Sequence, residues 1–201
     1  MDNKKILLVN LSKGRLGDLN ANLLGLVIVG KIMMTALGRT EYLHTNPPPF
    51  YLYIDEFQNV TTNTIAIILA EARKFRLSMT MAHQYIQQLI PEIKNAVFGN
   101  VGTQVIFRVG PDDAEYMTKQ FDPYLGASDF LKVDNYHAYV RLLSGGKPLS
   151  PFSLETINFI AGDHANAEAL KHMSYQRYGR ARDVVEEEIR QKYDAMREGK
   201  Q

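Results

Sequence analysis

The chain has no cysteine among its 201 residues. This absence excludes a disulfide framework, a thiolate metal site and a cysteine nucleophile, and it fits a reducing compartment such as the cytoplasm. Neither sign of charge dominates, because 23 Lys and Arg residues stand against 22 Asp and Glu residues. A nucleic-acid partner would therefore need a local basic surface. With 45% hydrophobic residues, the composition predicts a globular domain with a sizeable core.

A long hydrophobic run is absent as well. The longest apolar stretch, residues 23–37, contains Lys31 and is shorter than the ~20 apolar residues that a membrane-spanning helix needs. We therefore expect a buried helix there and no membrane span. The N-terminus leads into a short apolar run without the small-residue cleavage site of a secretory signal, which also favours a cytoplasmic location.

Short strands and helices alternate through the first 120 residues. Strands are expected at 6–9, 50–54, 77–81 and 103–109, and helices at 19–37, 61–75, 86–98 (broken at Pro91) and 111–120. This alternation predicts an α/β fold, a parallel sheet flanked by helices, with ligands at the carboxyl ends of the strands.

The second part of the chain has a different pattern. Two strand-like runs, 137–143 and 148–154, are joined by a Gly-rich turn at 144–147, which predicts a small β-hairpin that closes the sheet. From Asp163 onward the sequence is polar and helix-prone, so we expect a mobile helical tail. We divide the chain into a core domain, residues 1–157, and a tail, residues 158–201.

The strand expected at 50–54 ends in Asp55 and Glu56. Nucleotide hydrolysis by P-loop folds uses adjacent carboxylates at the end of a hydrophobic strand. Asp55 would hold Mg²⁺ through water, and Glu56 would orient or deprotonate the attacking water. Gln84 follows the next strand and could sense a γ-phosphate through water, while Gln58 lies just beyond the acids. The alternative is that the strand simply ends in a polar turn.

A phosphate-binding loop has glycines followed by a lysine and a hydroxyl residue, and we find none. The segment 25–32 has the glycine and lysine spacing, but Ile32 replaces the hydroxyl and the spacer is aliphatic, so we interpret it as part of a helix. In the turn 12–17 the lysine precedes the glycines, which is the wrong order for a phosphate-binding loop. Its Lys13 and Arg15 could contact phosphate or DNA, or the turn could serve chain geometry alone.

Four segments carry a more specific resemblance, namely 6–17, Tyr53–Asn59, Glu71–Lys74 and Ala82–Gln84. Together they resemble the conjugation and type IV secretion ATPases of the HerA/FtsK superfamily, the TraG/TraD-like coupling proteins. The resemblance covers about residues 5–155 and implies the C-terminal half of a RecA-like core. It makes Asp55 and Glu56 the Walker B acids and Gln84 the polar sensor on the next strand.

This resemblance implies a DNA-translocating motor. Its partners would be DNA, a homo-hexameric ring or partner ATPase subunits, and membrane-associated secretion machinery at the inner face of the cell membrane. Its cofactors would be ATP and Mg²⁺, once the missing Walker A segment is supplied. Ring ATPases also insert an arginine across a subunit interface. Arg73, Arg76 and Arg108 are candidates, and surface ion pairs are the alternative.

In that family the Walker A segment lies upstream of the strand with which this chain begins, so we do not expect hydrolysis by this chain alone. The chain would be a fragment, the product of a split gene, or a remnant that contributes acids to a partner's site. Two other functions stay open. One is a non-catalytic interaction module that binds DNA or partner subunits without hydrolysing ATP, and the other is a RecA-like helicase or packaging motor.

Overall fold

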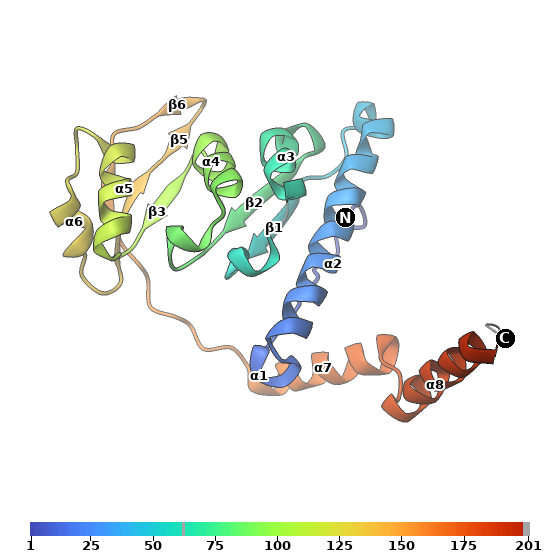
Figure 1. Ribbon diagram of the computed structural model, residues 1–201. Helices are drawn as coiled ribbons and strands as arrows, with labels where there is room; N and C mark the ends of the chain where they lie inside the picture. Colours follow the sequence, from blue (N-terminus) through green and yellow to red (C-terminus); the bar gives the residue numbers. More distant parts are fainter. Residues whose placement is uncertain (62, 199–201) are drawn as a thin grey trace. The chain divides into compact units, whose positions relative to one another are not determined.

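The computed structural model describes residues 1–61 and 63–198 and divides into two compact units, Met1–Thr156 and Ile157–Gln201. The first unit is mixed α/β (Figure 1). Its helices are α1 (Lys13–Leu16), α2 (Asp18–Leu37), α3 (Asn63–Glu71), α4 (Pro91–Asn100), α5 (Pro111–Phe121) and α6 (Ala127–Leu131). Short 3-10 helices are η1 (Gly38–Thr45), η2 (Phe57–Val60), η3 (Ala72–Phe75) and η4 (Ile86–Gln88). The strands are β1 (Phe50–Ile54), β2 (Leu77–Met81), β3 (Gln104–Ile106), β4 (His137–Arg141), β5 (Leu143–Ser144), β6 (Lys147–Pro148) and β7 (Phe152–Glu155).

The strands β1 and β2 form a parallel pair, in register from Phe50 opposite Leu77 to Ile54 opposite Met81. This is the parallel arrangement that the sequence predicts. Alternate residues of β1 pack against the core formed by α2 and α3, because side chains of a strand point to opposite faces. On the other face, Tyr51 and Tyr53 are 61% and 72% exposed. Helices therefore cover one face of this pair in the described chain.

The remaining strands correct the prediction of one parallel sheet. β3, β4 and β7 form a separate antiparallel sheet, and β5 and β6 form a small hairpin around the predicted Gly-rich turn. Two helices, α5 and α6, connect β3 to β4. The chain re-enters the sheet at the same end at which β3 leaves it. That connection produces an antiparallel neighbour instead of a parallel one.

The N-terminal aliphatic run is the clearest difference from the sequence prediction. Residues 6–9 form no strand, and Ile6, Leu7 and Leu8 are 88%, 63% and 84% exposed. They belong to an extended segment that runs beside β1 without pairing to it. The prediction of a buried strand is therefore wrong for this structure, since an aliphatic run forms a strand only where a neighbour pairs with it.

The long helix α2 is confirmed in its bounds but is buried along one face alone. Ala21, Val29 and Met33 lie in the core, while Leu23 and Met34 on the opposite side are more than half exposed. Among the described residues, α2 with the following turn (Asp18–Glu41) is the one helix long and apolar enough to cross a membrane. A core helix of a folded domain has the same length and composition, and α2 packs on β1 (Figure 1).

Other predicted elements are found close to their expected positions. The helix expected at 86–98 is interrupted between η4, which ends at Gln88, and α4, which begins at Pro91, and α5 likewise starts with Pro111. Proline suits the first turn of a helix because its missing N–H would have no intrahelical acceptor there. The second unit consists of α7 (His164–Tyr178), capped by the Asp163 side chain, and α8 (Arg182–Glu198). The tail is therefore helical, as predicted.

Candidate functional site

The carboxyl ends of β1 and β2 lie side by side and deliver polar residues to one place. The backbone continues the pairing past both strands, since Ala82 N donates to Ile54 O at 2.9 Å and Phe57 N donates to Ala82 O at 3.0 Å. Directly beyond these bonds, Gln84 Nε2 donates to Glu56 Oε1 at 2.5 Å. The parallel register thus joins Glu56 and Gln84, two residues 28 positions apart that the sequence placed at neighbouring strand ends.

Glu56 has an unusual local conformation. Its backbone is left-handed, with φ 49° and ψ 45°, which costs a non-glycine residue energy and persists only where surrounding contacts enforce it. Phe57, 1% exposed, supplies such a contact by packing into the core with Leu89 and Ile93. Burial of Phe57 holds the turn in which Glu56 presents its carboxylate.

Each carboxylate oxygen of Glu56 accepts a hydrogen bond from a side-chain amide. Gln58 Nε2 donates to Oε2 at 2.5 Å, and Gln84 Nε2 donates to Oε1. The bond from Gln58, followed by that from Gln84, lowers the pKa of Glu56, and the nearby charge of Lys13 adds to this. Glu56 is therefore a fixed carboxylate that can accept hydrogen bonds from a ligand or a water, and it is a weaker base than an ordinary glutamate.

Asp55 directly precedes Glu56 at the end of β1. Its Oδ1 accepts the Glu56 N–H at 2.9 Å, and the side chain is exposed. An exposed carboxylate of this kind fits Mg²⁺ held through water, because Mg²⁺ keeps several waters and takes few protein ligands. Within residues 1–61 and 63–198, no three His, Asp or Glu side chains gather as a metal-ion group, so Asp55 would act with ligands from elsewhere.

A polar hollow of about 620 Å³ lies next to Glu56. It is lined by Lys13, Glu56, Gln58, Asn59, Gln84 and Gln88. Lys13 Nζ lies 3.4 Å from Asn59 Oδ1 and 3.5 Å from Asp18 Oδ1. Lys13 was predicted as a phosphate contact, whereas Asn59 and Gln88 were missed. Asn59 follows the end of β1 and Gln88 follows the end of β2, and this position in the sequence could have identified them.

The described residues do not form a complete binding site for the phosphates of ATP in this hollow. The turn at α1 uses the N–H groups of Arg15 and Leu16 internally, because both donate to Ser12 O. The hollow therefore offers one lysine and side-chain amides, and no loop of backbone N–H donors of the type that cradles phosphates. This agrees with the missing phosphate-binding motif in the sequence.

His83 directly precedes Gln84 and packs against the core residue Phe57. Its ring packs edge-on against Phe57, with centroids 5.3 Å apart, and its Nδ1 is buried without a hydrogen-bond partner among the described residues. Burial lowers the pKa of His83, although a backbone hydrogen bond at Tyr85 and the charges of Asp113 and Glu56 oppose the shift. His83 therefore favours the neutral form, which suits a packing role.

The predicted arginines lie elsewhere. Arg73 is exposed in η3, whose end is tied to the start of β1 by the Phe50 N–H to Arg76 O bond, so it lies at the opposite end of the strands from Glu56. Arg108 follows β3 and donates to Asn135 Oδ1 at 3.0 Å. Arg15 is exposed on α1 and does not line the hollow. None of the three joins Glu56 within one chain, so a role for Arg73 or Arg108 across a subunit interface stays a prediction.

Comparisons with known proteins add little to this geometry. No protein-family model matches the chain, and no curated protein matches it. Among solved structures, VirB4 of Thermoanaerobacter pseudethanolicus aligns with 16% sequence identity and a TM-score of 0.38. The alignment covers 50% of this chain and 30% of that chain.

Proposed function

We propose that the chain is a subunit or part of an ATP-dependent DNA-translocating motor of the conjugation or type IV secretion class. The observation that supports this is the direct hydrogen bond between Glu56, at the end of β1, and Gln84, at the end of the neighbouring parallel strand. A nucleotide-hydrolysing site of the P-loop type needs an acid for the attacking water and a polar group near the γ-phosphate, and these two residues suit those roles.

In this proposal the chain supplies half of a nucleotide site. Asp55 would hold Mg²⁺ through water, Glu56 would orient the attacking water, and Lys13 would face the phosphates across the hollow. The phosphate-binding loop would come from a segment outside the described chain or from a partner subunit. DNA, a hexameric ring and secretion machinery at the inner face of the cell membrane are the proposed partners, and Arg73 or Arg108 would act across the ring interface.

The two amide hydrogen bonds to Glu56, which lower its pKa, favour a second candidate, a non-catalytic module of the same motor that binds DNA or partner subunits. A carboxylate held by two amides is a poor proton acceptor. The two candidates differ in one respect, since the motor requires Glu56 as a charged carboxylate in turnover and the module does not.

The test joins a strand and a Gly-x-x-x-x-Gly-Lys-Thr loop to the start of the chain and measures DNA-stimulated ATP hydrolysis. In this fusion, Glu56→Gln should lower kcat by about 10²–10⁴-fold, the usual contribution of an acid–base group. Glu92→Gln, on the exposed start of α4, is the matched control and should leave kcat unchanged. Equal turnover in the fusion and in its Glu56→Gln variant would exclude the motor and leave the binding module.

A further inference from the structure

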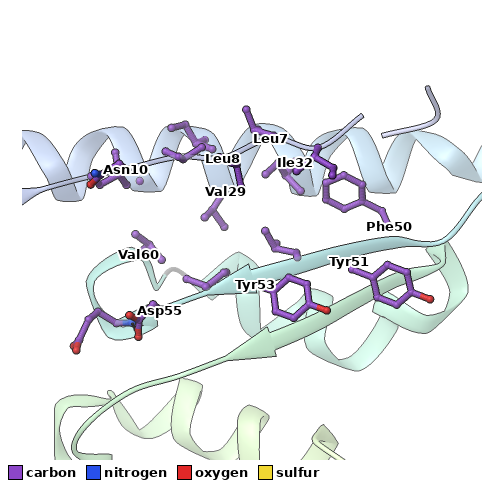
Figure 2. A pocket seen from close by; sticks show the side chains of 18 of the residues that line it. Leu7, Leu8, Asn10, Val29, Ile32, Phe50, Tyr51, Tyr53, Asp55 and Val60 are labelled. Carbon is purple, nitrogen blue, oxygen red and sulfur yellow. Dashed lines mark hydrogen bonds between the residues drawn. The ribbon is translucent and has the colours of Figure 1, made fainter. Parts of the chain in front are cut away.

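Exposed apolar side chains occur in both units of the chain. In the first unit they line a groove of about 990 Å³ between β1, α2 and the N-terminal segment, and they share that one space (Figure 2). In the second unit, none of the residues 164–197 is buried. Most of the stability of a protein helix comes from the packing of an amphipathic face. The second unit therefore needs a partner for one of its helices.

The helix α8 has a face of this kind. Four of its apolar residues recur four, four and three positions apart, and we call them the α8 stripe: Val185, Ile189, Tyr193 and Met196. This spacing places them along one side of the helix. Ile189, Tyr193 and Met196 are 48%, 66% and 68% exposed. The apolar residues of α7 are not gathered on one side in this way, so α8 is the helix that needs a partner.

The charges of α8 are divided along its length. Residues 182–188 contain one basic and four acidic residues, whereas residues 189–197 contain three basic residues and one acidic residue. This order suits the dipole of the helix itself. It also makes α8 complementary to a second α8 that runs in the opposite direction. In a parallel pair, by contrast, the two acidic halves would lie side by side and repel each other.

The spacing of the α8 stripe fits an antiparallel pair with two-fold symmetry. In such a pair, Val185 of one copy lies opposite Met196 of the other. The same register places Ile189 opposite Lys192, beside Glu188 of the facing helix. The aliphatic stem of a lysine packs on apolar side chains while its charge reaches outward. Lys192 therefore extends the apolar contact and faces a carboxylate of the other copy.

We propose that the α8 stripe is the surface through which two copies of this chain associate, with their α8 helices antiparallel. Pairing removes the stripe from water in both copies, and the opposite charges of the two halves favour the antiparallel direction. A membrane surface fits α8 less well, because helices that lie on membranes carry mainly Lys and Arg on their polar side. Residues 182–197 have four basic and five acidic residues. This inference does not rest on the proposed function, because it follows from the second unit alone.

The absence of cysteine in the chain allows single cysteines to report the direction of pairing in the full-length protein. Two differently tagged copies, one with Val185→Cys and one with Met196→Cys, are co-expressed, purified and oxidised. An antiparallel pair brings these two positions together and separates like positions by about 16 Å, far beyond the Cα spacing of a disulfide. The mixed disulfide should therefore exceed either homodisulfide by about tenfold.

Two other results would overturn the proposal. An excess of the Val185→Cys homodisulfide would show parallel pairing. Monomers without a disulfide would show that α8 docks on its own chain or on a different partner.

Sedimentation of the full-length protein provides a second measurement, the dissociation constant of the dimer. Ile189→Asp places a charge in the α8 stripe, and the matched control Gln191→Asp places the same charge on the opposite side of α8. Ile189→Asp should raise the dissociation constant by about tenfold or more, and Gln191→Asp by less than about threefold. Association through the first unit, such as the proposed ring, would be the same in both variants. Equal dissociation constants for the two variants would overturn pairing through α8.

Discussion

The two ends of the β1–β2 pair both carry polar side chains but use them differently. At the amino end, Arg39 is fully buried, donates to Phe75 O at 2.8 Å and pairs with Asp2. At the carboxyl end, Glu56 and Gln84 bond to each other at the wall of a hollow. Burial with bonds to backbone marks a structural role, whereas polar groups that line a hollow are available to a ligand. The amino end of this strand pair is therefore structural, and the carboxyl end holds the candidate site.

The largest effect is expected at the amino end. Arg39→Ala leaves the buried carbonyl of Phe75 without its donor, so the free energy of unfolding should fall by about 1–3 kcal/mol. Arg73→Ala is the matched control, because Arg73 is exposed in η3 near the same strand ends, and it should change stability by less than about 0.5 kcal/mol. Urea unfolding of both variants checks this. Equal losses would contradict the structural role of Arg39.

A smaller effect is expected from pH at the carboxyl end. Burial lowers the pKa of His83 in the folded chain, so the unfolded chain takes up a proton first as the pH falls below about 6.5. The stability that neutral His83 contributes is therefore present above this pH and is lost as the pH falls toward the lower folded pKa. Thermal unfolding between pH 7.5 and 5 should show a drop in Tm that His83→Asn reduces. The same pH dependence in both proteins would exclude His83 as its source.

The sequence predicts the local elements of this chain well and its pairing poorly. β1 and β2 have the predicted bounds, and the break at Pro91 follows from proline chemistry. Pairing depends on contacts between segments distant in the chain. The aliphatic run at 6–9 and the antiparallel partner of β3 therefore could not be derived from periodicity alone.

Some residues of the candidate site could likewise be predicted from the sequence, and others could not. Glu56 and Gln84 could be predicted, because each directly follows a strand and parallel strands end at one edge. Arg73 could not be placed, because its position at the amino end depends on how η3 leads back into β2. Asn59 and Gln88 reach the hollow through 3-10 turns, whose side-chain directions are not visible in a sequence.

The smallest expected change is in the titration of the Glu56 carboxyl group, which NMR can follow and which reports directly on the hydrogen bond between Glu56 and Gln84. Gln58 is close to Glu56 in sequence, so removal of Gln84 is the change that tests the geometry joining the two strands. With both amide hydrogen bonds in place, the pKa of Glu56 should lie below the usual ~4.3 and should rise in Gln84→Ala. It should stay unchanged in the control Gln87→Ala, whose side chain donates to Asp112 instead. An ordinary Glu56 pKa that neither variant changes would contradict the site.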